Sequence, residues 1–117
     1  MKLTLMRAKI HHATITHADL NYEGSISINK SLLLASKILV NEKVDVLNLN
    51  NGERFTTYVI LGEDNNTIQI NGAAARKVQV GDKIIIIAYG SMDYEEAQKF
   101  QPNVVIADAK NQPLRIV

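Results

Sequence analysis

Short stretches in which apolar and polar residues alternate dominate the chain and predict β-strands. Residues 44–49 alternate, and the β-branched and aromatic run 55–61 follows them after the turn-forming residues 50–53. These two runs predict a β-hairpin. Three further strands are predicted, over residues 67–70, over the continuous apolar run 84–87, and over residues 104–106.

Helices are expected to be few and short. Asn29 is placed to cap a helix over residues 30–36, and Asp93 to cap one over residues 94–100. A single helical turn is expected over residues 73–76, directly after a glycine. The chain is therefore expected to be mainly β.

The chain also contains an internal similarity. Residues 36–47 align with residues 76–87 at a constant offset of 40. Three lysine or valine pairs are identical: Lys37 and Lys77, Val40 and Val80, Lys43 and Lys83. The repeat favours a pseudo-twofold barrel in which each half contributes a helical turn, a tight turn and a core strand. The alternative is a chance likeness between two unrelated segments that each run from a turn into a strand.

Composition excludes some classes of protein but does not indicate a function. The 117 residues suit one domain, with 46% hydrophobic and 21% charged residues. A net charge of +1 gives no basic face for nucleic acid or a membrane surface. The chain has no cysteine, and Arg7 and Lys9 interrupt any signal-peptide stretch, so a cytoplasmic location is expected. Residues 111–113 are expected to form a loosely held tail.

Most familiar catalytic motifs are missing. There is no phosphate-binding glycine loop, zinc-ligand spacing or Ser-His-acid signature. If His11 and His12 lie on a strand, their rings point to opposite faces and cannot ligate one metal ion. Polar residues instead border the apolar segments, at Lys9, His11, Tyr22, Ser25, Arg54, Thr57, Tyr58 and Asn71. From these patterns alone, the chain is a small β-barrel in which Gly24-Ser25 is an ordinary tight turn.

Three blocks of sequence change that interpretation. Residues 9–25 (KIHHATITHADLNYEGS), 50–58 (NNGERFTTY) and 71–76 (NGAAAR) together resemble the aspartate 1-decarboxylases, in family order and spacing. These pyruvoyl-dependent enzymes make β-alanine for pantothenate synthesis. The resemblance implies a small six-stranded double-psi β-barrel with a few short helices, assembled as a homotetramer. His12 stands where the family more often has arginine, which puts only a surface or interface contact in doubt.

The resemblance gives Gly24-Ser25 a chemical role. It implies that the Ser25 hydroxyl attacks the Gly24 carbonyl, with Thr57 assisting. The single domain 1–117 would then self-cleave into a β chain, 1–24, and an α chain, 25–117, either spontaneously or with a maturation factor. Ser25 would become a covalent pyruvoyl group, which binds the substrate amine as a Schiff base, so neither metal nor pyridoxal phosphate is expected.

The resemblance also assigns the residues of an L-aspartate site between neighbouring subunits. Arg54 would bind the α-carboxylate bidentately, and Lys9, assisted by His11, the side-chain carboxylate. Tyr58 would be the proton donor that quenches the carbanion. The remaining expected site residues are Asn71 near the pyruvoyl carbonyl, Thr57, Gly72, Ala73 and Ala74 as substrate contacts, and Tyr22 as a pocket-lining residue.

Two alternatives stay open at this point. The chain could be a non-enzymatic barrel, a binding or scaffold module whose Gly24-Ser25 bond stays intact. It could also be a pyruvoyl decarboxylase for another acidic amino acid, because pocket geometry rather than sequence sets the length of the substrate.

Overall fold

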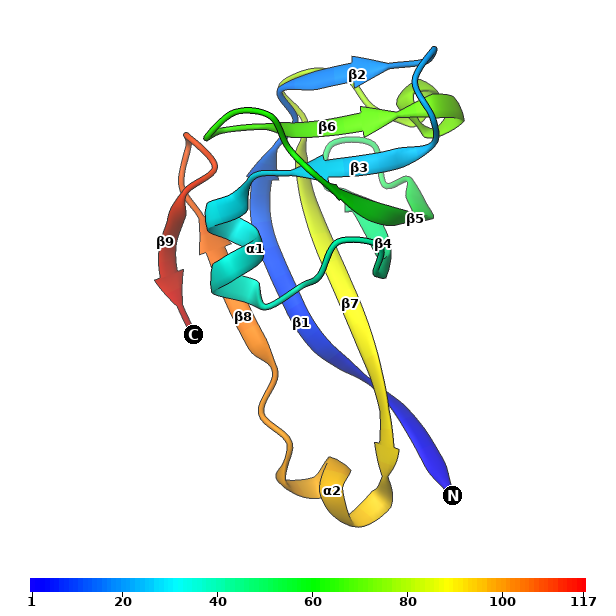
Figure 1. The fold of residues 1–117 in the computed structure, drawn as a ribbon, viewed down its shortest axis with the longest axis vertical. Coiled ribbons are helices and arrows are strands. Elements are labelled where there is room, and N and C mark those ends of the chain that lie inside the picture. Colours follow the sequence, from blue (N-terminus) through cyan, green and yellow to red (C-terminus); the bar gives the residue numbers. More distant parts are fainter.

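The computed structural model describes all 117 residues and is mainly β, with nine strands and three short helices (Figure 1). Every strand predicted from the alternation is present, and the strand predicted over 84–87 extends much further. In chain order the elements are β1 (Lys2–Thr14), β2 (His17–Asp19), β3 (Ser25–Ile28), α1 (Lys30–Ser36), β4 (Lys43–Asn48), β5 (Arg54–Leu61), β6 (Ile68–Asn71), the 3-10 helix η1 (Gly72–Lys77), β7 (Lys83–Asp93), α2 (Tyr94–Lys99), β8 (Asn103–Ala107) and β9 (Pro113–Ile116).

Six neighbouring strands close into a ring. The strand order is β2-β6-β3-β5-β4-β7-β1-β8-β9, and β4 and β5 form the predicted hairpin. The first strand of this ring, β6, meets the last, β1, at Thr16, which directly follows β1. The Thr16 N–H donates to the Ile68 carbonyl over 2.8 Å, and Thr16 Oγ1 accepts from the Ile68 N–H over 3.0 Å. β2, β8 and β9 lie outside this ring. The long pair β1 and β7 extends beyond the ring, with α2 at its far end (Figure 1).

The internal repeat is confirmed as a structural repeat. Each copy contains a tight turn, at residues 39–42 and 79–82, in which an acidic side chain accepts from the first N–H of the turn. The two bonds are Leu39 N to Glu42 Oε1, 3.0 Å, and Gln79 N to Asp82 Oδ2, 2.9 Å. The third residue of each turn has positive φ, 75° at Asn41 and 96° at Gly81.

The two turns also make equivalent long-range contacts. Turn 39–42 exchanges two backbone hydrogen bonds with Val59, of 2.8 and 3.0 Å, and turn 79–82 exchanges two with Ile15, of 2.8 and 2.9 Å. Both turns lead into strands whose alternate residues enter the core. A chance likeness does not produce matching bonds at both ends, so the pseudo-twofold interpretation holds.

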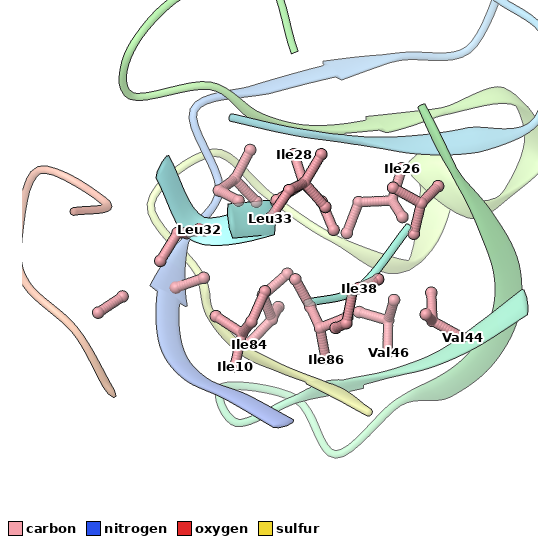
Figure 2. Close-up of a cluster of buried hydrophobic side chains, with 14 of the residues drawn as sticks. Ile10, Ile26, Ile28, Leu32, Leu33, Ile38, Val44, Val46, Ile84 and Ile86 are labelled. Carbon is pink, nitrogen blue, oxygen red and sulfur yellow. The ribbon is translucent and has the colours of Figure 1, made fainter. Parts of the chain in front are cut away.

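One apolar core of 20 buried residues fills the ring and continues beyond it to Val105 and Ala107 on β8 (Figure 2). The repeated strands β4 and β7 supply Val44 and Val46, and Ile84 and Ile86, all at most 1% exposed. α1 covers one side and adds Leu32. Burying a side chain of this size contributes roughly 1.5–3 kcal/mol.

The helices follow the predicted positions, with one difference. The Asn29 side chain caps α1 by accepting from the Leu32 N–H over 2.9 Å. α2 begins after Asp93, but the Asp93 carboxylate makes no capping bond and lies instead 3.4 Å from the Lys2 ammonium. The prediction of Asp93 as a side-chain cap was therefore wrong, because pairing of β7 with β1 gives the carboxylate another partner. No helix has the length and apolarity needed to cross a membrane.

The prediction of a loosely held tail over residues 111–113 was also wrong. Asn111 is 1% exposed, and its side chain bonds both the N–H and the carbonyl of Thr14 at 2.8 Å. Its own carbonyl accepts from the Asn29 amide, also at 2.8 Å. The following residues form β9, which pairs with β8. Long-range bonds hold this segment, and local composition does not reveal them.

Candidate active site

Ser25 opens β3 and is the residue around which the site is built. It is 1% exposed, although Gly24 just before it is exposed. In the antiparallel pairing of β3 with β6, Ser25 lies opposite Asn71. A buried serine thus directly follows an exposed glycine.

Two hydrogen bonds hold the Ser25 hydroxyl. It donates to the Glu23 carbonyl over 3.0 Å and accepts from Asn71 Nδ2, also over 3.0 Å. The same Asn71 nitrogen donates to Ser27 Oγ over 3.1 Å, and Asn71 Oδ1 accepts from Gln69 Nε2 over 2.8 Å. Asn71 is fully buried. The expected proximity of Asn71 and Ser25 is therefore present.

Gly72 packs directly against the backbone of Gly24. Its φ is +77°, and a Cβ built there would lie 2.7 Å from Gly24 Cα and 3.3 Å from the Tyr22 carbonyl oxygen. Only glycine permits both this conformation and this approach. Gly72 begins η1, where Ala73 is exposed and Ala74 half-buried.

β5 brings Tyr58 alongside Ser25. Val59 pairs with Ile26 in the parallel β3–β5 ladder, so the preceding Tyr58 occupies the position beside Ser25. Its side chain is 40% exposed. Thr57 is half-buried and points to the opposite face of β5 from Tyr58, because side chains alternate along a strand.

Arg54 lies at the other end of the same strand, four residues from Tyr58, or about 13 Å along a strand. Its Nη2 is 3.1 Å from Asp45 Oδ2 and 3.0 Å from the Tyr89 hydroxyl, which itself donates to Asp45 over 2.9 Å. Hydrogen bonds from Thr56, and then from Tyr89 and Arg54, lower the pKa of Asp45. Burial and the bond to Asp45 raise the pKa of Tyr89. Within one chain, Arg54 is thus paired with a carboxylate.

Lys9 lies in a different part of the ring from Ser25. It is half-buried on β1, which pairs with β7 and β8, whereas the strand of Ser25 pairs with β5 and β6. Lys9, Ile87 and Asp45 occupy one row across β1, β7 and β4. A single chain therefore assembles the residues around Gly24-Ser25 but does not gather Lys9 and Arg54 beside them.

The two adjacent histidines differ from prediction. His12 has a φ of 65°, at an irregularity in the β1–β7 pairing between Ile10 and Ala13. The His11 and His12 rings consequently stack, with centroids 4.0 Å apart, rather than pointing to opposite faces. Burial, together with the neighbouring His12 and Lys9, lowers the pKa of His11, and His11 Nδ1 is buried without a hydrogen-bond partner.

The sequence did not single out Ser27, Gln69, Asp45 or Tyr89, although each contacts a predicted site residue. Ser27 and Gln69 also line a cavity of about 300 Å³, together with Tyr22. Spacing along the strands could have revealed two of them. Ser27 lies two positions from Ser25, and Gln69 two positions from Asn71, so each shares a strand face with a predicted residue.

The fold and the site define a class: small, mainly β barrel-like proteins in which a buried serine follows a glycine at the start of a strand. Comparison with known proteins makes this specific. A model of the aspartate decarboxylase family matches residues 1–114. The chain belongs to the aspartate decarboxylase family, whose members are lyases, as the three sequence blocks indicated.

Curated relatives agree over nearly the whole chain. An aspartate 1-decarboxylase from Thermoanaerobacter pseudethanolicus is 55% identical over 117 residues, covering 99% of this chain and all of the relative. One from Cytophaga hutchinsonii is 54% identical over 112 residues, covering 95% and 97%. One from Maricaulis maris is 56% identical over 112 residues, covering 95% and 93%.

Proposed function

We propose that this protein decarboxylates L-aspartate to β-alanine and CO2, supplying pantothenate and coenzyme A synthesis in the cytoplasm. Membership of the aspartate decarboxylase family supports the reaction. The observation that supports the mechanism is the hydrogen bond from Asn71 to the hydroxyl of buried Ser25, the residue that follows Gly24.

The chain first cleaves itself. Ser25 Oγ attacks the Gly24 carbonyl carbon, the C–N bond breaks, and an ester replaces the amide while the freed Ser25 nitrogen gains a proton. Elimination releases the Gly24 carboxylate and leaves dehydroalanine. Water then replaces the nitrogen, ammonia leaves, and a pyruvoyl group caps the α chain, 25–117, beside the β chain, 1–24. Gly24 offers no Cβ to block the attack, and Thr57 stabilises the oxyanion.

The residues around Ser25 suit a pyruvoyl group. Asn71 offers N–H donors at the Ser25 side chain, and the absent side chain of Gly72 leaves the backbone of the cleavage site close and unobstructed. Asn71 and the backbone of Gly72, Ala73 and Ala74 would hold the group. When bound, its carbonyl supplies the electron sink that amino-acid decarboxylation needs.

Two cations bind the two carboxylates of the substrate. Arg54 presents a guanidinium suited to bidentate binding of the α-carboxylate, and Lys9 pairs with the side-chain carboxylate, assisted by a neutral His11. Because Lys9 and Arg54 both lie away from Ser25 within one chain, a homotetramer with sites between subunits would bring them to the Ser25 of a neighbouring subunit. Arg54 then exchanges Asp45 for the substrate carboxylate.

Tyr58 protonates the carbon that loses CO2. Its side chain is partly exposed, and the residue occupies the strand position beside Ser25. A phenol holds a transferable proton at neutral pH and can act as a general acid when it is close to the reacting carbon. Tyr22, which lines the adjacent cavity, closes this end of the site.

Product analysis tests the reaction. The purified protein, alone and with cell extract as a source of any maturation factor, is incubated with L-aspartate or L-glutamate, and released CO2 and amine are measured. We expect β-alanine from aspartate and no product from glutamate. Product from glutamate alone would identify a decarboxylase for the longer acid, and no product from either would contradict the proposed function.

A further inference from the structure

Gln69 on β6 is tied to the cleavage site through Asn71. Its Nε2 donates to Asn71 Oδ1 over 2.8 Å, and the Asn71 Nδ2 group donates to the hydroxyls of Ser25 and Ser27 over 3.0 and 3.1 Å. Gln69 does not touch the Gly24-Ser25 bond itself. Its contact is with the side chain that does bind Ser25.

The direction of this chain of hydrogen bonds is set by Ser25. The single proton of the Ser25 hydroxyl goes to the Glu23 carbonyl oxygen, which can only accept. Any other partner of the hydroxyl must therefore donate, and Asn71 must present its NH2 group. The Asn71 carbonyl oxygen then faces Gln69, which must donate in turn.

Burial makes this orientation matter. Asn71 is fully buried, so water cannot replace a lost partner of its carboxamide. If the Asn71 carboxamide rotated by 180°, its oxygen would face Ser25 Oγ and its NH2 group would face the Gln69 NH2 group. With the Gln69 carboxamide in its observed orientation, the rotated state of Asn71 loses this bond and is disfavoured.

We propose that Gln69 is a positioning residue for self-cleavage: it holds the Asn71 carboxamide so that an N–H, not the oxygen, faces Ser25 Oγ. This inference rests on the proposed cleavage at Gly24-Ser25. As Oγ bonds to the Gly24 carbonyl carbon and loses its proton, electron density on Oγ is stabilised by the Asn71 N–H. An Asn71 oxygen in that place would repel it. Bonds within a chain of this kind also strengthen one another.

Two variants separate positioning from folding. Gln69→Leu removes the donor. Gln69→Glu keeps the size of the side chain, but its ability to donate depends on protonation. A neutral carboxyl can donate to Asn71 Oδ1, whereas a carboxylate can only accept. Gln98→Leu on the exposed face of α2 is the matched control.

The experiment measures the rate of Gly24-Ser25 cleavage by intact mass spectrometry of freshly purified full-length chain, between about pH 4 and 8, with unfolding midpoints recorded for each variant. We expect Gln69→Leu to be about 10- to 100-fold slower than wild type and Gln98→Leu to be unchanged. The rate of Gln69→Glu, relative to wild type at the same pH, should fall as pH rises through the pKa of the introduced carboxyl.

The outcomes are distinct. Recovery of Gln69→Glu at low pH, with an unfolding midpoint close to wild type at every pH, supports positioning. Recovery that follows a rise in the unfolding midpoint would show a folding effect instead and overturn the positioning role. Wild-type cleavage together with unchanged rates in both Gln69 variants, or a Gln69→Glu rate ratio that does not vary with pH, would overturn the role of Gln69 alone. A wild-type chain that never cleaves would overturn the proposed function and this role together.

Discussion

Gly72 and Gly24 show how the site depends on missing side chains. Replacing Gly72 with alanine would place a Cβ 2.7 Å from Gly24 Cα, at a φ of +77°. We expect Gly72→Ala to lower the free energy of unfolding by more than the roughly 1–2 kcal/mol that positive φ alone costs, and to slow cleavage by shifting Gly24.

Gly52→Ala is the matched control for this prediction. Its φ is +78°, but a Cβ there would meet nothing within 4 Å. Urea unfolding and a cleavage time course compare the two variants. If they lose equal stability and cleave at equal rates, the close approach of Gly72 to Gly24 does not matter.

Single residues differ in how far sequence could predict them. Ser25, Asn71 and Gly72 lie in blocks that resemble a known family, and the structure places them together. Gln69 could not be predicted in the same way, because its contact requires Asn71 to turn its carboxamide across the β3–β6 pair. The stacking of His11 on His12 depends on a positive φ at a non-glycine residue, which alternation does not reveal.

At the scale of elements, Asp45 joins β4 to β5 and β7. Its carboxylate accepts from Thr56, Arg54 and Tyr89, and these bonds lower its pKa. The resulting stabilisation is present above the ordinary aspartate range and is lost as pH falls through the lowered pKa. We therefore expect Asp45→Asn to cost about 1–2 kcal/mol at neutral pH and progressively less below about pH 4.

Thermal unfolding of wild type and Asp45→Asn across this pH range measures the difference. Asp64→Asn, in an exposed loop, is the control and should match wild type throughout. A difference between wild type and Asp45→Asn that stays constant with pH would show that the carboxylate charge is not what stabilises these strands.

Elements were predictable where their cause is local. The hairpin of β4 and β5 follows from alternation around a turn, and α1 follows from the Asn29 cap. β9 was missed because its order comes from pairing with β8 and from the buried Asn111. Those contacts connect residues far apart in sequence.

For the whole molecule, Asn111 ties the end of the chain to the ring. Its side chain bonds Thr14 and the Asn66 carbonyl, and its carbonyl accepts from Asn29. Because it is buried, Asn111→Ala leaves polar groups unpaired and should lower the free energy of unfolding by about 2–3 kcal/mol. Urea unfolding checks this against Asn65→Ala in the exposed loop, and equal stabilities would contradict it.

The molecule as a whole also explains what one chain lacks. Lys9 and Arg54 both lie away from Ser25: Lys9 shares a strand row with Asp45 across β1, β7 and β4, and Arg54 pairs with Asp45. The internal repeat predicted the pseudo-twofold barrel of one chain. How separate subunits pack against one another leaves no local pattern in the sequence. The proposed homotetramer supplies that relation.

Intact mass spectrometry of the purified protein tests the central claim most directly, with Ser25→Ala as the uncut control. The account predicts two chains, 1–24 and 25–117, with no free amino group at the start of the longer one. A wild-type chain that stays whole, like Ser25→Ala, after long warm incubation with cell extract would contradict it.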